Sequence, residues 1–355
     1  MKKLILIIAV LGITVPYAVL ADGMFVPPPD RYAYETDQKA VIFYENNIET
    51  MVLSVQFFGN AYDFGWIVPT PAYPEISKSS DELFTALEEY TEVDYPYKVY
   101  VPSGGLGYAE SGRQAVEVLE TLNVDYYEVT ILRASDSSAL TDWLQENNYD
   151  FPDGADYLLD DYIDNNWFFT CFKIDTSALG YSKVSKELRT GHATPVQIRF
   201  ASDQIVYPLK ISGVMSQYDY KAKELIYDYY YQPPEEISIL LYVFTDHRQT
   251  VPGYETDYAG WVTKDTISKF AYVDGKPWLS PGSDKYFLTR MHNTTSLAAI
   301  KDDVYFRQAD NDELVNSEPL QDNSNVGFWV VVGIGLALSV GLIFVIIGIQ
   351  IRKYN

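Results

Sequence analysis

The hydrophobic pattern divides the chain into two uninterrupted apolar segments and a long stretch of alternation between them. Leu4–Ile13 follows two lysines and leads to a small-residue exit at 19–21, the layout of a cleavable secretory signal. Phe328–Ile349 runs for 22 residues without a charge, so as a helix it would cover the roughly 30 Å core of a bilayer. We therefore predict a signal peptide at 1–21 and a transmembrane helix at 327–350.

The residues around the second apolar segment predict its orientation. Arg352 and Lys353 follow it and acidic residues precede it, and cytoplasmic flanks carry the excess of Lys and Arg. We expect a single-pass protein of the cytoplasmic membrane, with 351–355 in the cytoplasm and the N-terminal domain extracytoplasmic.

A face of small residues runs along the predicted membrane helix. Gly333, Ala337 and Gly341 recur at every fourth position, a spacing that lets two helices approach closely and would support a homodimer. Glycine is also common in membrane helices that do not pair, so both interpretations stay open.

Alternation of apolar and polar residues predicts β-strands in the region between the two segments. Residues 38–45 and 48–58 are expected to form a hairpin around Asn46 and Asn47, with alternate residues of the second strand facing a core. Trp167–Ile174 and Ile237–Phe244 are apolar on both faces, which is typical of strands buried inside a sheet.

Three segments show helical periodicity. The first begins near Ser79-x-x-Glu82, a capping-box pattern, and the others begin near Asp136 and Asp153. Together with the hairpins they predict an α+β fold, with antiparallel hairpins early and late and a helical middle from about 136 to 166.

Breaks in composition suggest the domain organisation. We expect an ectodomain at 22–310, with a lobe boundary near 176–195 where glycine and proline interrupt a polar stretch. An acidic tether at 311–326 would join the ectodomain to the membrane helix.

The charge balance excludes some partners. The chain has 49 acidic and 26 basic residues, a net charge of −23, which repels nucleic acids and anionic lipid surfaces. Cationic partners are electrostatically allowed, although an acidic surface also serves solubility alone. Cys171 is the only cysteine, so no intramolecular disulfide can form.

Five sequence segments carry a resemblance to a known family. In order they are residues 38–44 (QKAVIFY), 63–71 (DFGWIVPTP), 140–149 (LTDWLQENNY), 206–212 (VYPLKIS) and 242–248 (YVFTDHR). Together they resemble the bacterial domain of unknown function family numbered 2330, over about residues 22–308. The resemblance implies a secreted or membrane-anchored protein, and it brings no agreed catalytic residues.

The residue triple Asp246-His247-Arg248 is the most site-like feature, because it follows an apolar strand and strand ends commonly carry function. His247 could act as a general base, but neighbouring residues on a continuing strand face opposite ways, so Asp246 and His247 would not pair directly. Structural pairing of Arg248 is the alternative. Trp66, ahead of two prolines, is a candidate for stacking a sugar or peptide, or else a core residue.

No pattern in the sequence indicates a metal or cofactor. The only histidines are His192, His247 and His292, and none has the close spacing of a zinc motif. We predict no metal site, no cofactor and no catalytic residue that can be named.

The function favoured by these observations is a non-enzymatic, membrane-anchored extracytoplasmic module that binds an envelope component or a membrane protein partner. Two alternatives stay open. One is an envelope hydrolase that uses Asp246 and His247, and the other is an accessory subunit of a membrane complex.

Overall fold

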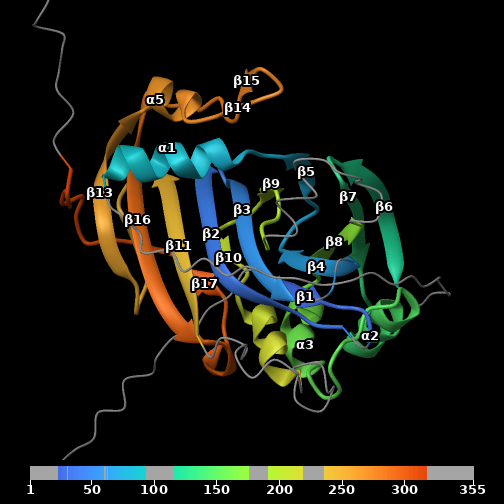
Figure 1. The fold of residues 1–355 in the computed structure, drawn as a ribbon. Coiled ribbons are helices and arrows are strands. Elements are labelled where there is room, and N and C mark those ends of the chain that lie inside the picture. Colours follow the sequence, from blue (N-terminus) through green and yellow to red (C-terminus); the bar gives the residue numbers. More distant parts are fainter. Residues whose placement is uncertain are drawn as a thin grey trace, which may run out of the picture. The chain divides into compact units, whose positions relative to one another are not determined.

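The computed structural model describes residues 23–29, 31–59, 61, 63–92, 116–175, 191–218 and 236–317. Most of these residues lie in strands, which form two larger sheets and three short two-stranded ones (Figure 1).

The larger sheet has seven strands and is built around a parallel pair. In spatial order its strands are β13 (Glu255–Thr263), β16 (Lys285–Ser296), β11 (Glu236–Thr245), β2 (Ala33–Glu45), β3 (Ile48–Gly59), β9 (Val196–Ala201) and β5 (Glu75–Lys78). Strands β11 and β2 run parallel, and the neighbouring pairs are antiparallel. The predicted hairpin is confirmed, because Asn46 and Asn47 take the positive φ values of 54° and 59° that a tight two-residue turn requires.

The second sheet has five antiparallel strands. Its order is β1 (Met24–Val26), β4 (Asp63–Thr70), β8 (Phe168–Asp175), β7 (Tyr127–Arg133) and β6 (Glu117–Val124). The short sheets pair β10 (Val206–Tyr207) with β17 (Val304–Tyr305), β12 (Gln249–Thr250) with β18 (Arg307–Gln308), and β14 (Tyr272–Val273) with β15 (Lys276–Pro277).

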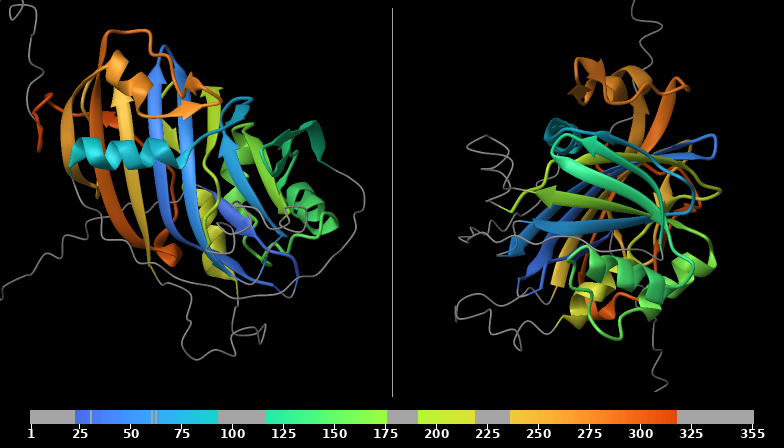
Figure 2. Two further views of the ribbon diagram at one scale, coloured as in Figure 1. Left: turned by 45° about the horizontal axis from the view of Figure 1, so that its top comes forward. Right: turned by 90° about the vertical axis from the view of Figure 1, so that its right-hand side faces the viewer.

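Strand β11 is covered on both faces. Leu240, Tyr242 and Phe244 belong to a core under helix α1 (Asp81–Thr91) and helix α5 (Lys264–Lys269). The alternate residues Ile239 and Leu241 belong to a core shared with the five-stranded sheet. Figures 1 and 2 show α1 crossing the strands of the seven-stranded sheet on one side. The second sheet lies beside the end of the seven-stranded sheet that contains β3 and β9. The two-sided apolar pattern of this strand is thereby confirmed as that of a sheet interior.

Three further helices lie beside the second sheet. They are α2 (Ser137–Glu146), α3 (Tyr157–Asp164) and the 3-10 helix η2 (Lys210–Gln217), and a short η3 (Leu297–Ala299) contacts η2. Asp136 caps α2 as predicted, and its carboxylate accepts from the Ala139 amide at 2.8 Å. The other two cap assignments were wrong, because Ser80 rather than Ser79 caps α1 and Asp156 rather than Asp153 occupies the cap of α3.

The predicted α+β class is wrong, because two sheets make up most of the described structure and the helices are short covers on them. Several strands were not predicted because they lack a regular alternation of apolar and polar residues. Strand β6 is an edge strand whose residues are mostly exposed on both faces, and β13 has a bulge between Thr256 and Tyr258 that breaks its alternation. In β16 a fully buried Arg290 interrupts the apolar pattern.

The predicted fold class also included a C-terminal transmembrane helix, and the described structure does not support it. None of the helices in the described ranges is both long and apolar enough to cross a bilayer. Residues 1–21 and 327–350, including Gly333, Ala337 and Gly341, lie outside the described residues.

Candidate functional site

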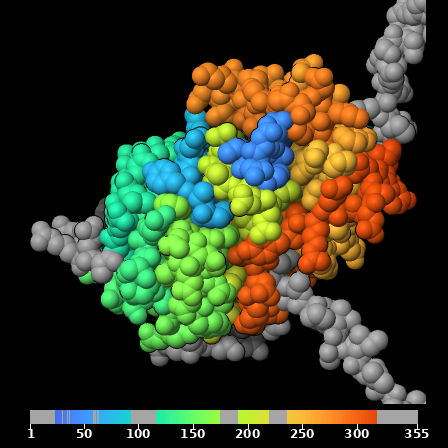
Figure 3. Space-filling view, turned by 180° about the vertical axis from the view of Figure 1, so that it is seen from behind, coloured from blue at the N-terminus to red at the C-terminus, as the bar shows by residue number. Residues whose placement is uncertain are grey.

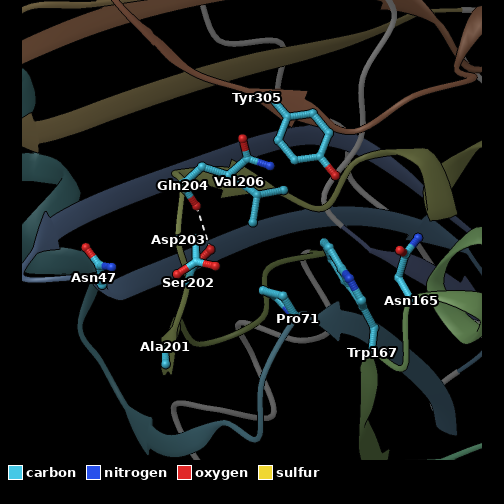
Figure 4. A pocket seen from close by; sticks show the side chains of 10 residues that line it. All are labelled: Asn47, Pro71, Asn165, Trp167, Ala201, Ser202, Asp203, Gln204, Val206 and Tyr305. Atoms are coloured by element: carbon cyan, nitrogen blue, oxygen red, sulfur yellow. Dashed lines mark hydrogen bonds between the residues drawn. The ribbon is translucent and has the colours of Figure 1, made fainter.

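Two adjoining pockets form a groove at the ends of several strands. The first, of about 480 Å³, is lined by Asn47, Pro71, Ser202, Asp203 and Gln204 among others, and we call it the amide chamber (Figure 4). The second, of about 320 Å³, is lined by Asp161, Tyr162, Lys210, Asp302 and Asp303, and we call it the acidic chamber. Asn165, Trp167 and Tyr305 line both chambers. We call the whole the Trp167–Tyr305 groove, and both volumes lie in the ~300–1,000 Å³ range of small-molecule pockets.

Turns from distant parts of the sequence supply the walls. Asn47 comes from the β2–β3 turn, Pro71 follows β4, and residues 201–204 end β9 and lead into β10. Trp167 precedes β8, and Tyr305 lies on β17 opposite Val206 of β10. In the space-filling view of Figure 3 these differently coloured parts of the chain meet on one face. The sheets thus act as a rigid scaffold for loop-borne side chains.

The end of helix α3 fixes the position of Trp167. Asn166 has a left-handed φ of 59° and donates its amide to the Ile163 carbonyl at 2.9 Å, and the Trp167 amide donates to the Tyr162 carbonyl at 2.8 Å. This is the pair of hydrogen bonds of a Schellman motif, which brings the residue after the turn back onto the last helical turn. The rings of Trp167 and Tyr162 accordingly pack with centroids 5.1 Å apart.

The opposite wall is held by three hydrogen bonds around Ser202. Its amide donates to the Asn47 carbonyl at 3.0 Å, and its carbonyl accepts from the Tyr44 hydroxyl at 2.9 Å. Its hydroxyl donates to the Gln204 carbonyl at 2.5 Å, the bond drawn in Figure 4. The β9–β10 turn is therefore tied to the neighbouring hairpin turn, so Asp203 and Gln204 are presented from a defined backbone.

Asp303 is the chemically most unusual group in the groove. Its Oδ1 accepts from the Tyr162 hydroxyl at 2.5 Å and from the Lys210 amide at 2.9 Å, and the Ile211 amide donates to the Tyr162 oxygen at 3.2 Å. Burial raises the pKa of Asp303 to about 6, although these hydrogen bonds favour its charged form. Burial likewise raises the pKa of Tyr162 well above its usual value, so this phenol stays a donor.

Negative charge outweighs positive charge along the groove. Lys210 is the one basic residue lining either chamber, and its ammonium pairs with Asp161. Its charge also favours the ionised form of Asp303, and Asp203 and Asp302 add two further carboxylates to the groove. Burial and the nearby carboxylates together raise the pKa of Tyr305, whose ring is 42% exposed.

The residues proposed from the sequence lie elsewhere. Trp66 is 1% exposed and packs in the core, with its ring centroid 5.0 Å from that of Phe172. His247 pairs with Asp312 rather than Asp246, at 2.9 Å between Nδ1 and Oδ2, and the same carboxylate accepts from the Arg248 amide at 2.8 Å. This contact raises the pKa of His247. Asp246, His247 and Arg248 are not among the residues that line the groove.

The histidines do not form a metal centre in the described part of the chain. His192 contacts Asp81 and His292 contacts Asp257, each at 2.9 Å, so each histidine is placed beside a different carboxylate. Among the described residues no group of three His, Cys, Asp or Glu side chains has the geometry of a metal site. Cys171 is buried inside β8, and this burial raises the pKa of its thiol.

Sequence patterns contain only partial signals for the groove. Asn46-Asn47 and Asn165-Asn166 are recognisable turn pairs, and each leads to a groove residue. Nothing local marks Tyr305, because its role depends on the pairing of β17 with β10.

Comparison with known proteins places the chain in a family. Residues 15–224 match the family described as "Uncharacterized protein conserved in bacteria (DUF2330)". The chain belongs to this family. Four of the five resemblance segments fall within the match, and the fifth, 242–248, lies beyond it. Membership in DUF2330 brings no activity or ligand, since the family is described as uncharacterised.

The other comparisons add little to DUF2330 membership. No curated protein matches the chain. Among solved structures, the crystal structure of baculovirus P35 aligns with 81% of this chain and 100% of its own, at 8% sequence identity and a TM-score of 0.36.

We predict that Asn166 tolerates glycine but not a β-branched residue. Asn166→Gly should leave the free energy of unfolding within about 0.5 kcal/mol of wild type, because glycine adopts a positive φ freely. Asn166→Val should destabilise by about 1–2 kcal/mol and shift Trp167 fluorescence, because valine is strained there. Urea unfolding measures both; equal losses in the two variants would contradict the Schellman account.

We further predict a pH signature for Asp303. The pKa of Asp303 in the folded protein is about 6, above the ordinary 3.8, so the folded state binds a proton at this carboxyl more tightly than the unfolded state does. As the pH rises from about 4 to about 6 that proton is lost, and the stability of the fold falls. Asp303→Asn cannot ionise. The free energy of unfolding of Asp303→Asn, measured relative to wild type, should therefore rise by about 1–3 kcal/mol between pH 4 and pH 7.

Asp302→Asn is the control for this measurement, because Asp302 is the exposed neighbour. A stability difference between Asp303→Asn and wild type that stays constant with pH would contradict the assignment.

Proposed function

We propose that this protein is a non-enzymatic binding module that takes an envelope component in the Trp167–Tyr305 groove. The observation that carries the proposal is the groove itself, in which two aromatic rings stand between a chamber rich in amide and hydroxyl groups and a chamber rich in carboxylates. Polar groups that converge on one pocket can fix the orientation of a ligand and give specificity.

The rigidity of the groove supports a binding role. The Schellman turn at Asn166 positions Trp167, and the pairing of β17 with β10 positions Tyr305. Hydrogen bonds around Ser202 fix the backbone that carries Asp203 and Gln204. Walls that are already ordered lose little conformational entropy when a ligand binds, which favours affinity.

The location is a proposal that rests on the sequence alone. The basic and apolar start at 1–21 and the positive charges at Arg352 and Lys353 support a domain on the outer face of the cytoplasmic membrane. Protease treatment of intact spheroplasts tests it, because an extracytoplasmic domain is cleaved and a cytoplasmic one is protected.

Tyr305→Ala should weaken binding of the full-length protein to an isolated envelope fraction about tenfold, because an aromatic anchor is removed. Tyr272→Ala is the matched control, since Tyr272 is also exposed, at 51%, and lies on β14 outside both chambers. Cosedimentation with the fraction gives the apparent Kd. Equal weakening by both variants, or by neither, would contradict a binding site at the groove.

A hydrolase is the second candidate, and one observation favours it. The pair of His247 with Asp312 resembles the base and orienting carboxylate of a hydrolase, and the side chain of His247 is 44% exposed. This candidate predicts that the purified protein turns over an ester, amide or glycoside substrate and that His247→Ala abolishes turnover. Absence of turnover across such a panel would remove it.

A further inference from the structure

The acidic chamber offers a place for one positive group. Asp302 and Asp303 lie on the short segment that leads into β17, and both line the chamber beside Tyr305. The ammonium of Lys210 pairs with Asp161 and its charge also acts on Asp303, but the three aspartates of the chamber outnumber this single lysine. An anionic ligand would therefore meet repulsion here, whereas a cation would gain both carboxylates and the faces of aromatic rings.

The amide chamber offers different chemistry in the same groove. Asn47 and Gln204 present side-chain amides, and Asp203 adds a carboxylate. Asn165 donates its side-chain amide to the Asp161 carbonyl at 2.7 Å and Ser202 donates its hydroxyl to the Gln204 carbonyl, which leaves their oxygens as acceptors. Such groups can both donate hydrogen bonds to hydroxyls and accept hydrogen bonds from them. Tyr305, which is 42% exposed, adds ring surface on which the C–H face of a sugar can stack, whereas Trp167 is only 9% exposed and forms the base of the groove (Figure 4).

We propose that the groove binds a saccharide that carries a free amino group. The proposal rests on the proposed binding function and names its ligand class. The sugar ring lies against Tyr305, its hydroxyls bond to the amides of the amide chamber, and its ammonium group faces Asp302 and Asp303. A neutral sugar would leave the carboxylates without a partner, and a simple amine would leave the amides unused.

The test compares two oligosaccharides that differ only at the amine. The full-length protein is titrated at pH 6 with a glucosamine tetramer, whose amines are protonated, and with the corresponding N-acetylglucosamine tetramer, which is uncharged. We expect the glucosamine tetramer to bind about tenfold more tightly, since charge-assisted hydrogen bonds are stronger than neutral ones. Raising the salt concentration should reduce this preference.

Two variants measure how much the aromatic ring and the carboxylate each contribute to the affinity. Tyr305→Ala should weaken binding of both tetramers about tenfold. Asp302→Asn should reduce the preference for the glucosamine tetramer, because Asp303 then remains as its carboxylate partner, and should leave the affinity for the acetylated tetramer unchanged. Asp246→Asn is the control, because it removes an exposed acid outside the groove and should change neither affinity.

A proton measurement gives a second, independent result. An ammonium group beside Asp303 favours its charged form, so binding of the glucosamine tetramer should release protons from Asp303, and this measurement is made at pH 5, where the sugar amines are already protonated before they bind. The binding heat should then vary with the ionisation enthalpy of the buffer, and the variation should disappear in Asp303→Asn.

The outcomes that overturn the proposal are distinct from those that overturn the binding function. Equal affinity for the two tetramers, with loss of both in Tyr305→Ala, rejects the amine and keeps the groove as a sugar site. Binding of tetralysine as tight as that of the glucosamine tetramer rejects the sugar and keeps a cation site. If neither tetramer binds while binding to the envelope fraction still depends on Tyr305, the saccharide class is wrong and the proposed function stands. If binding to the envelope fraction is also independent of Tyr305, both proposals fail.

Discussion

Burial of the seven-stranded sheet on both faces is the constraint on which the rest of the structure depends. Strands β11 and β2 form its parallel centre, with α1 over one face and the five-stranded sheet sharing the core on the other. Because a shift of one residue would move every side chain to the opposite face, the register of these strands is strongly specified. The strand ends, and with them the turns at Asn47 and at 201–204, are therefore fixed in space.

The groove follows from this arrangement. The turns at the strand ends meet the end of α3, where the Schellman motif directs Trp167 back toward Tyr162. The hydroxyl of Tyr162 reaches Asp303, so the residue that supports the aromatic wall also orients the buried carboxylate. One set of contacts thereby couples the shape of the groove to its charge, and this coupling underlies the role that we assign to the acidic chamber.

The sequence predicted the elements whose signals are local and missed those that depend on pairing. The Asn46-Asn47 hairpin, the buried β8 and β11 and the cap at Asp136 all depend on residues within a few positions of one another. Strand β16 was missed because Arg290, with its guanidinium 3.8 Å from Asp257 and 5.7 Å from the Tyr242 ring, occupies a core position. The groove was missed because its walls come from segments far apart in the sequence, and the polar triple that drew attention instead is held by Asp312, a residue assigned to a tether.

The most direct test of the account is hydrogen–deuterium exchange of the full-length protein with and without the envelope fraction. We expect binding to slow amide exchange in three segments that line the groove, at 161–167, 201–206 and 302–306. Slowed exchange confined to 246–248 and 312, around the His247–Asp312 pair, would contradict the central claim that the groove is the binding site.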